Sequence, residues 1–230
     1  MVVYKNVVTQ CNATHKSVPL ILSSVSADNH SEIYERRGIV QLYKDAGFRT
    51  LVVSCQAPNR SLIQMMCDEA DQTIYMNGLN DGAMLEPLRE TIAADTSDLF
   101  VILHCYGSHF NYRERYPNQF SQFTPDDDVS ISKKNRKRMV NAYDNSIIYT
   151  DWFISEVIST LRQTDACSAM FYCADHGEDL YDDRRGRFLH SSPTITYYQA
   201  HVACVGWYSD EWRATYPEKA EAAVANTMAP

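Results

Sequence analysis

The sequence predicts an α/β fold in which helices cover both faces of a mostly parallel, doubly wound sheet. Short apolar runs rich in β-branched residues alternate along the chain with longer segments of helical periodicity. The 230 residues can form a substantial core, and 45% hydrophobic and 22% charged residues are usual for a globular protein. No internal repeat or low-complexity linker divides the chain, so we expect one domain over residues 1–230.

Apolar runs and helical periodicity together give the elements in order. The predicted strands cover residues 2–8, 49–54, 99–103, 169–173 and 202–207. The predicted helices carry apolar residues every three or four positions and cover residues 32–46, 82–94 and 134–161. A short helix is expected to begin near Ser17, because Pro19 suits a first helical turn and fits poorly inside an established helix. Residues 107–130 form a long polar and aromatic loop.

Charge and cysteine usage exclude several classes of protein. The chain has 21 Lys and Arg against 29 Asp and Glu, a net charge of −8, so no basic surplus is available for nucleic acid. No run approaches the 18 or so apolar residues of a membrane span, and the first residues are not typical of a signal peptide. The seven cysteines are irregularly spaced without a CxxC pair, so they predict neither a zinc ribbon nor a disulfide framework.

Side chains that can bind a metal or act as a nucleophile follow three of the predicted strands. The segments after these strands are TQCNATHKS at 9–17, HCYGSH at 104–109 and ADHGED at 174–179. In an open α/β sheet, sites form beyond the carboxyl ends of the strands. We therefore expect these three segments to meet at one site.

Asp175 and His176 are the strongest metal-ligand candidates. A carboxylate beside an imidazole, followed by a turn at Gly177, can direct both side chains at one Zn²⁺. The alternative is that Asp175 caps the next turn and His176 is a surface residue. His190 ends a charged loop, and such a histidine on its own is more often a loop residue than a ligand.

Thr14 is a candidate nucleophile. Its hydroxyl is too weak an acid to attack unaided, so a bound metal would have to lower its pKa. A helix that begins just after Thr14 would also direct free N–H groups at a phosphoryl oxygen. The alternative is that Thr14 or Ser17 simply caps that helix, and the physics of these residues alone favours the cap.

Over nearly its whole length the chain resembles the catalytic domain of bacterial phosphoethanolamine transferases, in the sulfatase-like branch of the alkaline phosphatase superfamily. Each matching motif is short, but their order and spacing are specific to this family. The motifs are THKSVP at 14–19, AGFRT at 46–50, LHCYGSH at 103–109, RYP at 115–117, VNAYDN at 140–145, YTDW at 149–152, DHGE at 175–178 and FLH at 188–190. The resemblance implies a three-layer α/β/α sandwich.

The resemblance also implies an activity. In this family a metal-activated threonine takes phosphoethanolamine from phosphatidylethanolamine, forming a covalent intermediate, and passes it to lipid A or another envelope glycan. By this match Thr14 is the nucleophile and a zinc ligand, and Asp175 and His176 are further ligands of the same zinc. His109 and His190 match the histidines that hold the substrate phosphate or a second zinc. We add Lys16 as a phosphate contact because it is close to Thr14 in sequence.

Two features of the family pattern are not found in this sequence. The family's first zinc takes a glutamate from a GE[ST]xR-type motif upstream of the threonine, and only 13 residues precede Thr14 here. We therefore expect this chain to be part of a longer enzyme on the periplasmic face of the bacterial inner membrane, held by N-terminal spans and acting as a monomer. The cysteines that flank the family's threonine are also absent, since Leu20 occupies one position and only Cys11 is nearby.

Three alternative functions remain open. A sulfatase needs a C/S-x-P/A-x-R run, and the segment from Cys55 to Arg60 misses it because Asn59 stands where the arginine should be. A phosphomonoesterase or phosphodiesterase would use the same residues and differ only in admitting water. A domain with an inactive zinc site is the third alternative, because the upstream glutamate is missing.

Overall fold

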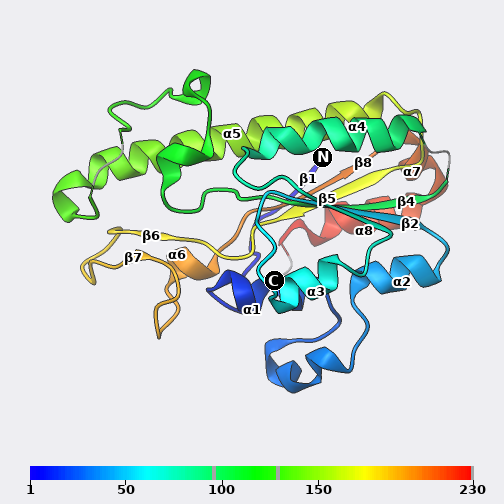
Figure 1. Cartoon of the computed structure of the whole chain (residues 1–230), viewed down its shortest axis with the longest axis horizontal. Helices are drawn as coiled ribbons and strands as arrows, with labels where there is room; N and C mark the ends of the chain where they lie inside the picture. Colours follow the sequence, from blue (N-terminus) through cyan, green and yellow to red (C-terminus); the bar gives the residue numbers. More distant parts are fainter. Residues whose placement is uncertain (95–96, 128–129, 229–230) are drawn as a thin grey trace.

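Helices lie on both faces of the strand layer, so the predicted three-layer α/β/α architecture is confirmed (Figure 1). The computed structural model describes residues 1–94, 97–127 and 130–228. One face carries α4 (Leu85–Ala94) and the long α5 (Arg136–Arg162). The other face carries α1 (Thr14–Ile21), α2 (Ile39–Asp45), α3 (Leu62–Cys67) and α8 (Pro217–Ala225).

The strands form two three-stranded groups of different pairing. In one, β2 (Arg49–Ser54) lies between β3 (Gln72–Tyr75) and β4 (Leu99–His104), and both pairings are parallel. In the other, β8 (Cys204–Tyr208) lies between β1 (Val2–Tyr4) and β5 (Ala169–Cys173), and both pairings are antiparallel. Parallel pairing is thus limited to the first group, because β8 runs in the opposite direction to its neighbours.

The core is built around β2. Val52 and Val53 are fully buried on opposite faces of this strand, as expected of a strand covered by helices on both sides. Val53 packs into a cluster with residues of α4 and α5, whereas Val52 packs into a second cluster with α1 and α3. Both faces are therefore held by apolar burial, and the carboxyl end of β2 is fixed in place.

Two predicted elements are shorter than expected. The strand predicted at 2–8 ends at Tyr4, and Val8 makes only an isolated bridge to His201. The helix predicted at 32–46 is broken into a 3₁₀ segment, Ala27–Tyr34, and α2. Gly38 causes the break, since it is extended and pairs with Ser23 before α2 begins.

The prediction that a helix begins near Ser17 is wrong. The helix α1 begins at Thr14, and Pro19 lies inside it. The N-cap residue is Ala13, which has no side-chain cap, so neither Thr14 nor Ser17 caps the helix. The Ser17 hydroxyl donates instead to the carbonyl oxygens of Cys11 and Ala13, at 2.8 and 3.2 Å. The helix therefore begins without a side-chain cap, and the Thr14 hydroxyl is available for another contact.

Hydrogen bonds hold the long loop after β4 against α5. Asn145, fully buried on α5, accepts hydrogen bonds from the N–H groups of Gln122 and Phe123 and donates to the Phe123 carbonyl. The aromatic residues Tyr112 and Tyr116 of this loop are buried, so they complete the core.

The remaining α-helices and β-strands are short. They are β6 (Asp179–Leu180), β7 (Phe188–Leu189), α6 (Tyr197–Ala200) and α7 (Asp210–Thr215), and the first two form a hairpin. Among the described residues, no helix is both long and apolar enough to cross a membrane.

Candidate active site

Four elements bring the predicted site residues together. Thr14 is the first residue of α1, and His109 lies in the loop after β4. Asp175 and His176 follow β5, and His190 follows β7. The three segments predicted to converge at the carboxyl ends of strands therefore do so.

Thr14, Asp175 and His176 form the centre of the site. The Thr14 hydroxyl oxygen lies 3.1 Å from Nε2 of His176. Oδ2 of Asp175 lies 3.5 Å from the same nitrogen. The His176 side chain is 10% exposed, so this group of polar atoms is largely shielded from water.

The tautomer of His176 follows from its second nitrogen. Nδ1 lies 2.9 Å from the carbonyl oxygen of Gly177, which can only accept a hydrogen bond. Nδ1 therefore carries the proton in the neutral ring, and Nε2 presents a lone pair to Thr14 and Asp175. A histidine that ligates a metal is held in this manner by a hydrogen bond from its other nitrogen.

Oδ2 of Asp175 is buried without a hydrogen-bond partner among the described residues. An unpaired carboxylate oxygen costs free energy when it is removed from water, so its position calls for a cation. Oxygen and imidazole ligands together suit Zn²⁺. Asp175, His176 and the Thr14 hydroxyl therefore fit a metal as three donors, although no cluster of three His, Cys, Asp or Glu side chains with metal-binding geometry occurs in the described part of the chain.

His190 is oriented by Glu178. Nδ1 of His190 lies 2.9 Å from Oε1 of Glu178, and the other carboxylate oxygen accepts a hydrogen bond from the Tyr112 hydroxyl at 3.1 Å. The Glu178 side chain is only 6% exposed. This hydrogen bond raises the pKa of His190 above its usual value, against the opposing effect of burial. The ring of His190 lies 4.1 Å from that of His176, and its Nε2 is left for the cleft.

His109 lies next to His190, with ring centroids 6.0 Å apart. Its Nδ1 donates to the carbonyl oxygen of Phe110 at 2.5 Å, so its Nε2 is also left for other contacts. The loop that carries His109 is fixed by Asp81, which is 4% exposed. The Asp81 carboxylate accepts hydrogen bonds from the N–H groups of Tyr106 and Gly107, at 2.7 and 2.9 Å.

A cleft of about 240 Å³ opens beside these groups. Thr14, His109 and His190 line it together with residues of the loop after β2, including Gln56 and Asn59. Lys16 does not line this cleft. It is exposed on α1, two residues after Thr14 and hence on nearly the opposite side of the helix.

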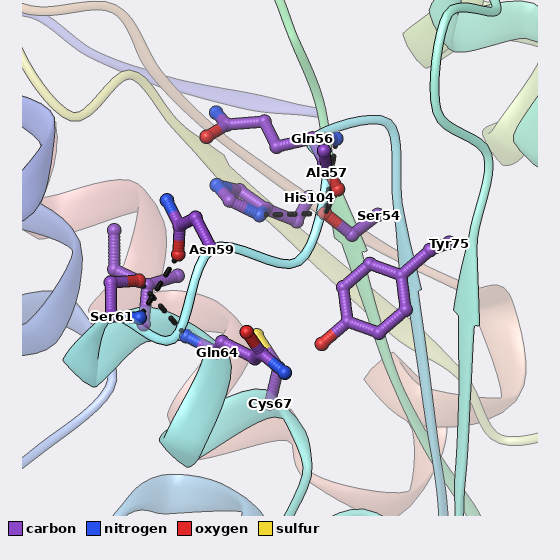
Figure 2. Close-up of a pocket in the computed structure, with 10 residues that line it drawn as sticks. Ser54, Gln56, Ala57, Asn59, Ser61, Gln64, Cys67, Tyr75 and His104 are labelled. Atoms are coloured by element: carbon purple, nitrogen blue, oxygen red, sulfur yellow. Dashed lines mark hydrogen bonds between the residues drawn. The ribbon is translucent and has the colours of Figure 1, made fainter.

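A second, smaller pocket of about 20 Å³ lies under the same loop. Figure 2 shows the imidazole of His104 in this pocket hydrogen-bonded to Ser54, with Nδ1 at 3.0 Å from the hydroxyl oxygen. Burial lowers the pKa of His104, and the negative charge of Asp175 opposes this effect. The pocket has room for about one water molecule.

Hydrogen bonds tie the segment before Thr14 to the segment around His190. The Asn12 amide donates to the carbonyl of Ser192 at 2.9 Å and to the Gln199 side chain at 2.6 Å. Gln199 is fully buried and donates in turn to Asp179 and to the carbonyl of Leu189. These contacts fix the position of His190 relative to α1.

Glu178, Asp81 and Asn12 all position residues of the site, although none of them was predicted to have a role there. Glu178 belongs to the DHGE motif, and its spacing of two from His176 could have marked it as a second orienting carboxylate. Nothing in the local sequence singles out Asp81 or Asn12, because their partners lie far along the chain.

The sulfatase alternative is not supported by the position of Cys55. A formylglycine precursor has to reach the substrate, but Cys55 is fully buried. Burial raises the pKa of the Cys55 thiol well above its usual range.

The family model described as Sulfatase matches residues 1–229. The chain belongs to the sulfatase family. Among curated relatives, phosphoethanolamine transferase EptA of Escherichia coli K12 is 29% identical over 234 residues, covering 94% of this chain and 42% of the relative. Phosphoethanolamine transferase EptC of the same strain is 24% identical over 233 residues, covering 94% and 40%. The resemblance found in the sequence is confirmed, and the chain spans about two fifths of these relatives' length.

Solved structures have the same fold. The soluble domain of lipooligosaccharide phosphoethanolamine transferase A from Neisseria meningitidis is 26% identical with a TM-score of 0.83, covering 93% of this chain and 67% of that chain. The C-terminal periplasmic domain of EptC from Escherichia coli, in complex with Zn, has a TM-score of 0.86 at 23% identity, covering 94% and 64%. The alkaline phosphatase and sulfatase-like architecture is thereby confirmed for this sulfatase-family chain.

Proposed function

We propose that this chain is the catalytic domain of a zinc-dependent phosphoethanolamine transferase in which Thr14 is the nucleophile. The observation that carries the proposal is the convergence of the Thr14 hydroxyl and the unpartnered Asp175 oxygen on Nε2 of His176. The curated relatives are named as phosphoethanolamine transferases, and one similar structure is described as a Zn complex.

Asp175, His176 and Thr14 would hold the zinc. A bound zinc would supply the positive charge that lowers the pKa of the Thr14 hydroxyl and makes it a better nucleophile. The N-terminus of α1 adds to this effect, because its partial positive charge favours a negative oxygen at Thr14.

The reaction runs in two displacements at phosphorus. The Thr14 oxygen attacks the phosphate of phosphatidylethanolamine, the bond to the glycerol oxygen breaks, and diacylglycerol leaves with a proton. A hydroxyl or phosphate oxygen of the acceptor then attacks the phosphothreonine and releases Thr14. Each step needs an in-line approach, which the position of Thr14 on the cleft wall allows.

His109 and His190 hold the oxygens of the transferring group. Both present Nε2 while Nδ1 is occupied, and both line the cleft with Thr14. Positioned cationic groups stabilise the charge that spreads over these oxygens in the transition state. The same orientation suits a second metal, and in either role the orientation of His190 depends on Glu178.

The donor is a membrane lipid, so the enzyme acts at a membrane surface. We place the complete protein at the periplasmic face of the inner membrane, attached through segments outside residues 1–230, and acting as a monomer on lipid A or another envelope glycan. The similar structures from Escherichia coli and Neisseria meningitidis support this placement, since they are described as a periplasmic domain and as the soluble domain of a lipooligosaccharide transferase.

Product analysis tests the reaction. The purified chain is incubated with zinc, vesicles containing phosphatidylethanolamine, and lipid A. Transfer predicts diacylglycerol together with lipid A that carries phosphoethanolamine. Free phosphoethanolamine without modified lipid A would instead identify a phosphodiesterase, and the absence of both products at saturating zinc would support an inactive domain.

A further inference from the structure

We propose that Cys173 and Cys204 form a disulfide that closes the site-bearing part of the chain into a covalent loop. Neither residue belongs to a motif that carries the family resemblance. The sequence alone gave no pairing for them, because they lie far apart in an irregularly spaced set of seven.

The register of the sheet brings the two residues together. β5 and β8 pair in antiparallel fashion, and Cys173 stands directly opposite Cys204. Side chains directly opposite in such a pair lie on the same face of the sheet. The two thiols therefore emerge side by side from neighbouring strands.

The hydrogen-bond pattern identifies the type of pair. The N–H of Ala174 donates to the carbonyl oxygen of Ala203 at 3.0 Å. The hydrogen-bonded pair is therefore Ala174 and Ala203, and the adjacent cysteine pair is a non-hydrogen-bonded one. Cα atoms of a pair without its own hydrogen bonds are about 4.5 Å apart. That separation lies within the range of about 4.4–6.8 Å that a disulfide spans, so the bond needs no large backbone movement.

Three of the other five thiols are less suitably placed. Cys55 is fully buried, and the thiol of Cys105 donates to the carbonyl oxygen of Leu103. Cys167 is exposed in the turn before β5. Cys204 is 3% exposed, so a bridge at this position would be protected from reduction once the fold is complete.

The position of the bridge gives it a consequence for the site. The segment between the two cysteines carries Asp175, His176, Glu178 and His190. A disulfide would join the two ends of this segment. Its Cys173 end lies two residues before Asp175, the first metal-ligand candidate within the segment. Covalent closure of a loop of roughly 30 residues lowers the entropy of the unfolded chain and thereby stabilises the fold.

The reaction is an oxidation by thiol–disulfide exchange. Two S–H bonds break and one S–S bond forms, so the cysteine pair loses two electrons and two protons. A disulfide co-reactant accepts them and becomes two thiols. An oxidising compartment supplies such co-reactants, and glutathione disulfide serves in the experiment.

Peptide mapping tests the linkage. The chain is equilibrated with oxidised and reduced glutathione, free thiols are alkylated in denaturant, and the digest is analysed by mass spectrometry. We expect a linked peptide pair joining Cys173 to Cys204, two hydrogens lighter than the reduced pair. Alkylation of both residues under oxidising conditions, or a linkage of Cys204 to another cysteine, would overturn the proposal.

Thermal unfolding gives a second readout. The oxidised chain should unfold at a Tm higher by about 5–15 °C than the reduced chain. Cys204→Ser should abolish this dependence on redox state, whereas the matched control Cys167→Ser should keep it. A Cys204→Ser variant with the full redox dependence would also overturn the proposal. Neither readout requires metal or substrate, so the result is separate from that of the transfer assay.

Discussion

The carboxylate of Glu178 lies 2.9 Å from Nδ1 of His190 and is itself held by the hydroxyl of the buried Tyr112. This chain of contacts runs from the core to the cleft. It fixes the ring of His190, which lines the cleft, and it favours the protonated ring. A hydrogen-bonded carboxylate behind a functional histidine contributes as much to a site as many direct contacts do.

Glu178→Gln should lower the pKa of His190 and reduce turnover by about 10–100-fold. The folded-state pKa of His190 is raised, so the ion pair's contribution to stability is complete below the unfolded pKa of about 6.5. It is lost as the pH rises through the higher folded value. Urea unfolding of the metal-free protein measures the free energy of unfolding between these two pKa values. It should fall with rising pH in the parent chain and fall less steeply in the variant. Glu156→Gln, which removes a partly exposed partner of Arg89, is the control and should change neither property.

His109→Ala and His190→Ala should each reduce turnover by about 10²–10³ while leaving zinc binding by Asp175 and His176 largely unchanged. The reason is that both histidines face the cleft and neither lies at the centre formed with Thr14. Turnover and zinc content of the two variants are measured together. His30→Ala, at an exposed position in the first 3₁₀ segment, serves as the control. Near-normal turnover in both variants would mean that these are only loop histidines.

Asp175→Asn should weaken zinc binding. The neutral amide cannot replace the charge of the buried, unpartnered oxygen. With free zinc at 100 times the dissociation constant, binding should stabilise the parent chain by about 2.7 kcal/mol, and this gain should shrink strongly in the variant. Thermal unfolding with zinc and with a chelator measures it. Asp151→Asn, at an exposed position on α5, should retain the full gain, and equal gains in both variants would remove Asp175 as a ligand.

Asp81→Asn should destabilise the fold by about 1–3 kcal/mol. The amide has one acceptor oxygen for the two N–H groups of Tyr106 and Gly107 that the carboxylate now satisfies. Because these residues lead to His109, turnover should fall more than stability alone explains. Denaturant unfolding and the transfer assay check the two effects. Asp127→Asn, which removes an exposed ion pair with Arg138, is the control, and an equal loss in both variants would argue against the anchoring role.

Long periodic segments were predictable from the sequence because burial decides them locally. The helix predicted at 134–161 lies within one or two residues of α5, and the strand predicted at 49–54 has the bounds of β2. The antiparallel pairing of β8 was not predictable, since strand direction depends on the path of the whole chain. The break at Gly38 depends on pairing with Ser23, which local periodicity does not reveal.

In the site, too, local features were predictable from the sequence and contacts between distant segments were not. Asp175 and His176 could be predicted as ligands because they are adjacent and follow a strand. The physics of single residues favoured a helix cap at Thr14. The actual partner of the Thr14 hydroxyl is His176, which lies 162 positions away in the sequence. Lys16 was chosen for proximity in sequence alone, but helical geometry turns it away from the cleft.

The most direct test of the account is the covalent state of Thr14. The chain is incubated with zinc and phosphatidylethanolamine vesicles without an acceptor, quenched in acid and mapped by mass spectrometry. Thr14→Ala is the comparison, and Thr215→Ala, at the end of the exposed helix α7, is the matched control. We predict one phosphoethanolamine group on Thr14 in the parent chain and in the control, and none in Thr14→Ala. Transfer to lipid A by a folded Thr14→Ala variant, or an adduct at a different residue, would contradict the assignment of Thr14 as the nucleophile.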